Sequence, residues 1–161
     1  MESELLNPIG HIFLANFLLL FGAHSYVSPM TLIVTGIAST LTDLDHIPWL
    51  RLAIKTRRFS PGARTRWHEL PGMLLSMAIS IVITYFSASL GRSLLIGFVS
   101  HYFLDLLTRP TRPFYPMSEK VVFLEMAPRS LRKLIVYDTV LTAVMGVIWI
   151  WSLHGQGFLC F

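Results

Sequence analysis

The sequence predicts an all-α fold, a polytopic membrane helical bundle with about five transmembrane helices in one domain spanning residues 1–161. Hydrophobic residues make up 53% of the 161 positions, and charged residues only 14%. The mean hydropathy is +0.60, whereas a soluble domain carries about a quarter charged residues. The composition therefore places the chain in a lipid bilayer.

Five apolar runs approach the roughly 20 residues that a membrane-spanning helix needs. The third and fifth are uninterrupted, whereas the second and fourth contain acids and histidines. The first is not expected to be a signal peptide, because its flank holds Glu2 and Glu4 in place of a basic region and no clear small-residue cleavage site follows. One cysteine, Cys160, excludes an internal disulfide. The predicted helices cover residues 9–27, 30–50, 70–90, 93–108 and 134–153.

The positive charges indicate the orientation of this bundle. They gather in the linkers after the second and fourth runs, which lie on one side if there are five spans. The positive-inside rule makes that side cytoplasmic, with the N-terminus inside and the C-terminus outside a cytoplasmic (inner) membrane. The linkers would attract anionic lipid headgroups, and no nucleic-acid partner is expected because no such module accompanies them. The basic residues are Arg51, Lys55, Arg57, Arg58, Arg64 and Arg66, then Arg109, Arg112, Lys120, Arg129, Arg132 and Lys133.

Acids and histidines gather at the cytoplasmic ends of four predicted helices. They lie at the start of the first run, in "TDLDHIP" at the end of the second, in "RWHELPG" before the third and in "HYFLD" near the end of the fourth. Four helices therefore bring imidazoles and carboxylates to one level, while His24 and His154 fall at the opposite end. The residues are His11, Asp43, Asp45, His46, His68, Glu69, His101 and Asp105.

This clustering predicts a metal site. His101 and Asp105 are four residues apart, which puts both side chains on one helix face about 5–6 Å apart. Left unpaired, each would cost about 2.5–3.5 kcal/mol at the bilayer centre, so a shared divalent cation is favoured. Imidazole with carboxylate suits zinc first, with manganese or iron as alternatives. Taken alone, each motif has a simpler reading, such as a hydrogen bond within one helix.

The motifs "GHIFLANF", "LTDLDHIPWL", "RTRWHELPGML" and "GFVSHYFLDLLTRPTRPFYP" together resemble the YdjM-type family of membrane-bound, metal-dependent hydrolases, from Gly10 to Pro116. The third block differs from the family pattern, because Ala63 replaces its first histidine and Glu69 follows His68 where a serine is usual. The resemblance implicates as site residues His11, Asp43, Asp45, His46, His68, His101 and Asp105.

The family is distantly similar to zinc-dependent phospholipase C and to P1-type nucleases. That similarity implies a ligand order in which the last aspartate bridges two metals. The later ligands of those soluble enzymes have no counterpart in this chain, so a centre of one or two ions is implied. The corresponding residues are His11, Asp45, His68, His101 and Asp105.

The hypothesis is a metal-dependent hydrolase of a phosphoester in a lipid or lipid-linked substrate, acting at the cytoplasmic face. Asp43 and His46 would be further ligands or would orient them, and either Glu69 or Asp43 would be the general base. Four arginines would grip the substrate phosphate, with headgroup anchoring as an equal alternative. They are Arg64, Arg66, Arg109 and Arg112.

Two other functions fit parts of the sequence. A lipid phosphatase with a histidine nucleophile fits "HYFLD" but lacks its PSGH block. A non-catalytic metal-binding membrane protein, either a scaffold or a transporter subunit, needs only the metal site. The apolar outer half of the bundle argues against a path through it. The linker "TRPTRPFYPMSEK" is expected to be an ordered, non-helical cap because its prolines forbid a helix.

Overall fold

The computed structural model describes residues 8–22, 27–46, 68–108, 112–122 and 131–158. Within these residues there are five α-helices, one short 3-10 helix and no strand, which confirms the all-α prediction. The elements are α1 (Pro8–Gly22), α2 (Pro29–Leu41), η1 (Thr42–His46), α4 (Leu70–Phe86), α5 (Ala88–Thr108) and α6 (Leu131–Gly155).

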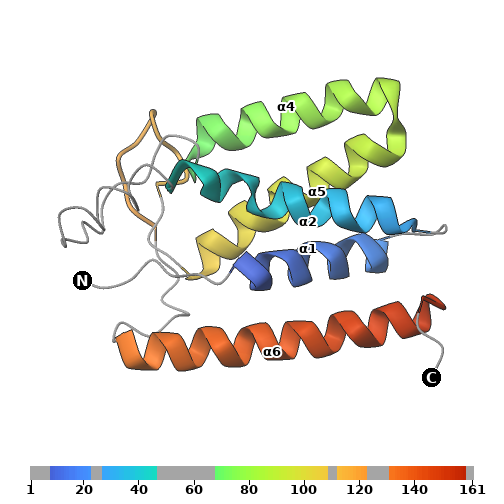
Figure 1. Ribbon diagram of the computed structural model, residues 1–161. Coiled ribbons are helices and arrows are strands. Elements are labelled where there is room, and N and C mark those ends of the chain that lie inside the picture. Colours follow the sequence, from blue (N-terminus) through green and yellow to red (C-terminus); the bar gives the residue numbers. More distant parts are fainter. Residues whose placement is uncertain (1–7, 23–26, 47–67, 109–111, 123–130, 159–161) are drawn as a thin grey trace.

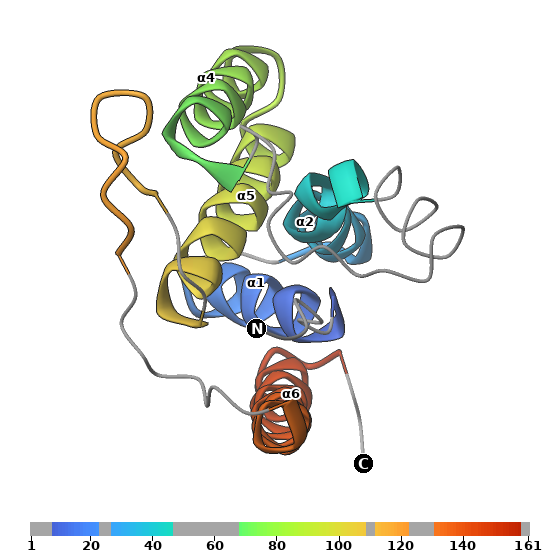
Figure 2. The ribbon, with the colours of Figure 1, turned by 90° about the vertical axis from the view of Figure 1, so that its left-hand side faces the viewer.

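The helices alternate in direction along the bundle. The starts of α1, α4 and α6 and the ends of α2 and α5 lie at one end, which we call the polar end (Figure 1). Seen from that end, α1 lies between α6 and the other helices, and α5 lies between α1 and α4 (Figure 2). The expectation that four helices deliver their polar residues to one level is therefore confirmed for the described helices.

Small residues let α2 and α5 approach closely. A Cβ placed on Gly97 would lie 2.6 Å from Ala38 Cβ and 2.7 Å from the carbonyl oxygen of Thr35, so only glycine fits there. Hydroxyls on both helices bond to their own backbone, since Ser39 Oγ donates to Gly36 O and Ser100 Oγ to Gly97 O, each at 2.8 Å. Close contact through small residues is typical of helices packed in a bilayer, where burying apolar surface gives no driving force.

The boundary between α4 and α5 differs from the prediction. The fourth helix was expected to begin at residue 93, but α5 begins at Ala88. Ser87 alone breaks the two helices, with an extended backbone at φ −154° and ψ 103°. Its Oγ accepts a hydrogen bond from Leu90 N at 3.3 Å, which caps the first turn of α5 and makes a separate loop unnecessary.

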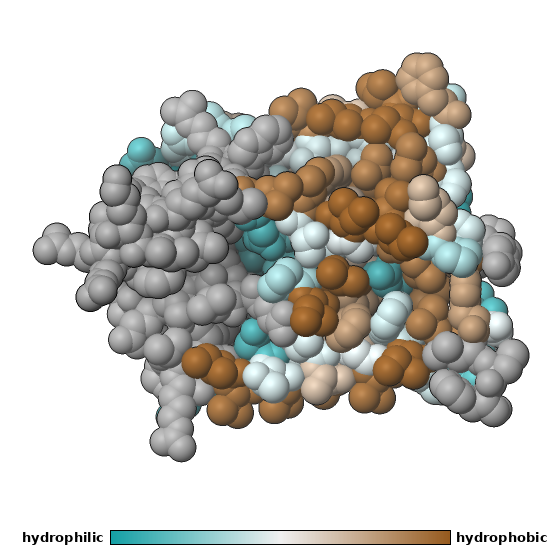
Figure 3. All heavy atoms as spheres, viewed as in Figure 1, coloured by the Kyte–Doolittle hydropathy of each residue, from teal (hydrophilic) through white to brown (hydrophobic). Residues whose placement is uncertain are grey.

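Five membrane spans are not confirmed. Among the described residues, only α5 and the Ile135–Gly155 part of α6 are long and apolar enough to cross a bilayer, whereas the other described apolar helices have 10–17 residues. α1 has 15 residues, or about 22 Å of helix against a hydrocarbon core of about 30 Å. Hydrophobic residues nevertheless cover the outer surfaces of α4 and α6 (Figure 3).

We expect Gly97→Ala to destabilise the protein by about 1–3 kcal/mol, because the added methyl group forces α2 and α5 apart. Thermal unfolding in detergent measures this loss. Gly155→Ala is the matched control, since a Cβ there meets nothing within 4 Å. Equal unfolding temperatures for the two variants would contradict the close packing of α2 against α5.

Candidate metal centre

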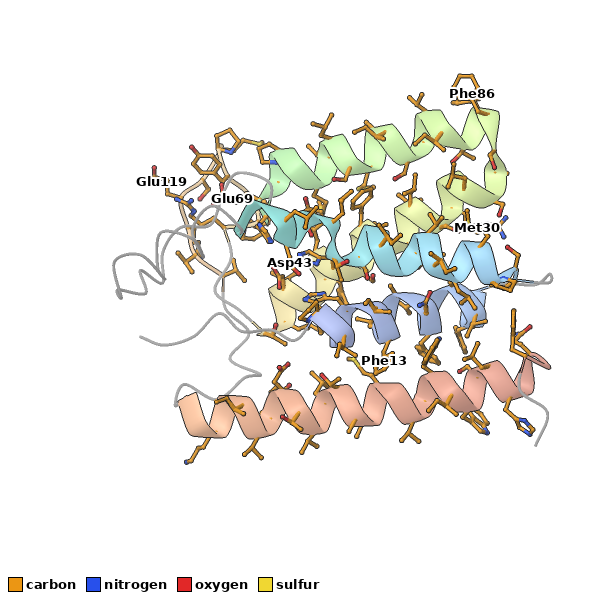
Figure 4. The ribbon with its side chains drawn as sticks, in the orientation of Figure 1. Phe13, Met30, Asp43, Glu69, Phe86 and Glu119 are labelled. Carbon is orange, nitrogen blue, oxygen red and sulfur yellow. The ribbon has the colours of Figure 1, made fainter. Side chains whose placement is uncertain are left out.

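Five side chains from four parts of the chain converge at the polar end. His11 lies in the first turn of α1 and Asp43 in η1, while His68 comes just before α4. His101 and Asp105 lie in the last two turns of α5. Asp43 lies at the same end as Glu69, opposite the end where Met30 and Phe86 lie (Figure 4).

The imidazoles and carboxylates alternate in space. Asp105 lies between two histidines, with Oδ1 3.9 Å from His11 Nε2 and Oδ2 3.7 Å from His101 Nε2. Oδ1 of Asp43 lies 3.8 Å from His101 Nε2 and 3.5 Å from His68 Nε2. The order is therefore His11, Asp105, His101, Asp43 and His68, with each imidazole facing a carboxylate.

These separations fit ligands of a common ion. All four exceed about 3.2 Å, the usual upper limit of a hydrogen bond between nitrogen and oxygen, and the His68–Asp43 separation of 3.5 Å is the nearest to that limit. Ligands arranged tetrahedrally at zinc distances of about 2.0–2.1 Å would lie about 3.4 Å from one another. Two sets of donor atoms lie within 4.8 Å of one another, namely His11 with Asp43 and His101, and His68 with His101 and Asp105.

The backbone orients the imidazole of His101. Its Nδ1–H donates a hydrogen bond to the carbonyl oxygen of Ser39 at 2.7 Å. The lone pair of Nε2 is therefore the one that can bind a metal. Nε2 is buried and makes no hydrogen bond to any described residue. The ring also stacks on that of His11, with centroids 4.3 Å apart and planes 24° apart. Both donor sets include His101, so they belong to one continuous cluster of potential ligands.

Asp43 is more exposed to solvent than the other potential metal ligands. His11, His101 and Asp105 are 1%, 0% and 2% exposed, whereas the Asp43 side chain is 27% exposed. Burial by itself raises the pKa of the Asp43 carboxyl, but the hydrogen bond to His68 and the nearby histidines lower that pKa to about 2. Asp43 is therefore ionised at neutral pH and forms the solvent-facing side of the described cluster.

Glu69 and Arg112 form a second polar contact at this end. Arg112 Nε donates to Glu69 Oε1 at 2.7 Å, and Arg112 Nη2 is paired with the same oxygen. The guanidinium also lies over the ring of Tyr115, 4.9 Å from its centroid. Arg112 is the first residue of the proline-rich linker that the structure describes after α5, and residues 113–117 form turns, in agreement with the prediction that the linker is not helical.

The structure therefore brings together five of the predicted site residues: His11, Asp43, His68, His101 and Asp105. Asp45 and His46 belong to η1, but their side chains lie outside the described residues. Arg64, Arg66 and Arg109 also lie outside the described residues, and His154 lies in the last turn of α6 at the opposite end, as predicted. Sequence reasoning missed the Ser39 carbonyl, because a backbone acceptor has no signal in the sequence.

We expect His101 to bind metal through Nε2 only, because the Ser39 carbonyl holds a proton on Nδ1. Nitrogen NMR of the histidine side chains would show Nδ1 of His101 still protonated after zinc is added, with the large shift at Nε2. A large shift at Nδ1 would contradict this orientation of the ring.

The comparisons with known proteins agree with the membrane architecture. The family model of the YdjM inner membrane protein matches residues 6–160, which extends beyond the motifs that first suggested the resemblance. No curated protein and no solved structure matched the chain. The two candidate spans in α5 and α6 are consistent with the family description. The chain belongs to the YdjM inner membrane protein family and is an inner membrane protein.

Proposed function

We propose that this protein is a membrane-embedded, metal-dependent hydrolase that cleaves a phosphoester in a lipid or lipid-linked substrate. The observation that carries the proposal is the buried cluster of three imidazoles and two carboxylates, spaced 3.5–3.9 Å from nitrogen to oxygen. Charged groups this deeply buried need pairing or a metal to offset their desolvation. The ligand set contains no thiolate, which suits zinc, manganese or iron.

The residues of the centre divide by exposure. His11, His68, His101 and Asp105 are the buried ligands, because all four are nearly inaccessible to solvent. Asp43 completes the set from the solvent side, where a substrate can reach it. A divalent ion held there would activate water and polarise the phosphoryl group. The four buried side chains would hold the ion, and their burial would keep bulk water from their side of it.

The surroundings of Asp43 favour an amphiphilic substrate. Leu41 and Leu44, on either side of it along the chain, are 44% and 54% exposed. An apolar surface therefore adjoins the accessible side of the centre, and in an inner membrane protein such a surface suits acyl chains. A lipid phosphoester would place its headgroup near Asp43 and its chains along α2.

The first test is metal content of detergent-purified protein by mass spectrometry. We expect near-stoichiometric zinc, manganese or iron in the wild type, and its loss in His101→Ala and Asp105→Asn. His154→Ala is the matched control, because His154 lies at the far end of α6. A wild type that stays metal-free after reconstitution would show that the cluster is a structural polar network.

Activity is tested separately on the metal-loaded protein. We expect release of the phosphorylated headgroup or of inorganic phosphate from vesicles that contain phosphoester lipids, and none from the His101→Ala variant. A protein that binds metal but hydrolyses none of these lipids would instead be a non-catalytic metal-binding membrane protein.

A further inference from the structure

We propose that Arg112 is a positioning residue for the metal centre, which fixes the imidazole of His68 through Glu69 and does not bind substrate. This inference rests on the proposed function, because it assigns a role around the same metal. It concerns the proline-rich linker, which the hydrolase proposal does not otherwise use.

The guanidinium of Arg112 is occupied by contacts within the protein. Nε and Nη2 both pair with Glu69 Oε1, and the guanidinium plane lies over Tyr115. Tyr115 N in turn donates to Arg112 O at 3.1 Å, and Ser118 N donates to Phe114 O at 3.0 Å. Consecutive turns therefore hold the cation in place, and its positive charge is neutralised by a carboxylate before any phosphate arrives.

Glu69 is far more buried than Arg112, so the position of its carboxylate depends on the ion pair. The side chain of Glu69 is 2% exposed and that of Arg112 is 39% exposed. Among the described residues, Arg112 is the cation paired with this carboxylate, whose Oε2 is buried and makes no hydrogen bond to a described residue. Removing one partner of such a pair leaves an uncompensated buried charge, which is strongly destabilising locally. Without Arg112, the Glu69 side chain is expected to turn towards water.

The backbone transmits that movement to the metal centre. Glu69 follows His68 directly and is the N-cap of α4, where its carbonyl oxygen accepts a hydrogen bond from Met73 N at 3.1 Å. His68 Nε2 lies 3.5 Å from Asp43 Oδ1, so a small rotation of this peptide separates the imidazole from the other donors. Arg112 thus controls the position of the His68 imidazole through the residue next to it. Partners of metal ligands commonly contribute about 10–100-fold in metal affinity.

The test measures zinc affinity and the visible spectrum of the cobalt-substituted, full-length protein. We expect Arg112→Ala to weaken zinc binding about 10–100-fold and to change the cobalt spectrum, because His68 leaves its position. Adding Glu69→Gln to Arg112→Ala should recover much of the affinity, since the uncompensated charge is then gone. Lys120→Ala is the matched control, because Lys120 is an exposed cation on the same linker.

The outcomes separate this inference from the hydrolase proposal. A wild type that binds no metal overturns the proposed function, and the positioning role falls with it. Metal in the wild type with normal affinity and spectrum in Arg112→Ala overturns the positioning role alone. A raised KM for a phosphoester lipid in that variant, with metal binding unchanged, would make Arg112 a substrate-binding residue. Loss of affinity without recovery in the double variant would also contradict action through Glu69.

Discussion

The charge balance around His101 is the constraint on which the rest of the polar end depends. This imidazole is completely buried, and its Nε2 faces the carboxylates of Asp43 and Asp105 while its Nδ1 donates to Ser39. Buried charges are tolerated only when they are paired or bind a metal. His101 therefore ties α5 to α2 and η1 through its two nitrogens, and to α1 through its stack on His11.

The helix packing makes this arrangement possible. Gly97 lies one turn before His101, and its lack of a side chain lets α5 approach α2 closely there. The approach brings the carbonyl of Ser39 within hydrogen-bonding distance of His101 Nδ1. A larger residue at position 97 would separate the helices and remove the acceptor that orients the ring. The small residues of the bundle are thus part of the site as well as of the fold.

The sequence predicted the residues of the centre better than it predicted their partners. The spacing of His101 and Asp105, together with the alternating helices, was enough to place both carboxylate and imidazole groups at one level. The Ser39 carbonyl and the Glu69–Arg112 pair were not predicted, because one is a backbone atom and the other joins segments 43 residues apart. The predicted start of this helix, residue 93, was wrong because one serine suffices to cap a helix after a break.

The prediction of five spans is not confirmed, because three of the described apolar helices have only 10–17 residues. Counting apolar residues treats each helix as if lipid surrounded it, yet α1 packs against α2, α5 and α6. Ala15, Leu19 and Leu20 of α1 are buried, and a Cβ on Gly10 would lie only 3.2 Å from Thr142 Oγ1 of α6. The buried face of such a helix meets protein and not lipid, so its length does not have to match the bilayer thickness by itself. The same enclosure places His11, the residue after Gly10, at the depth where α5 presents Asp105.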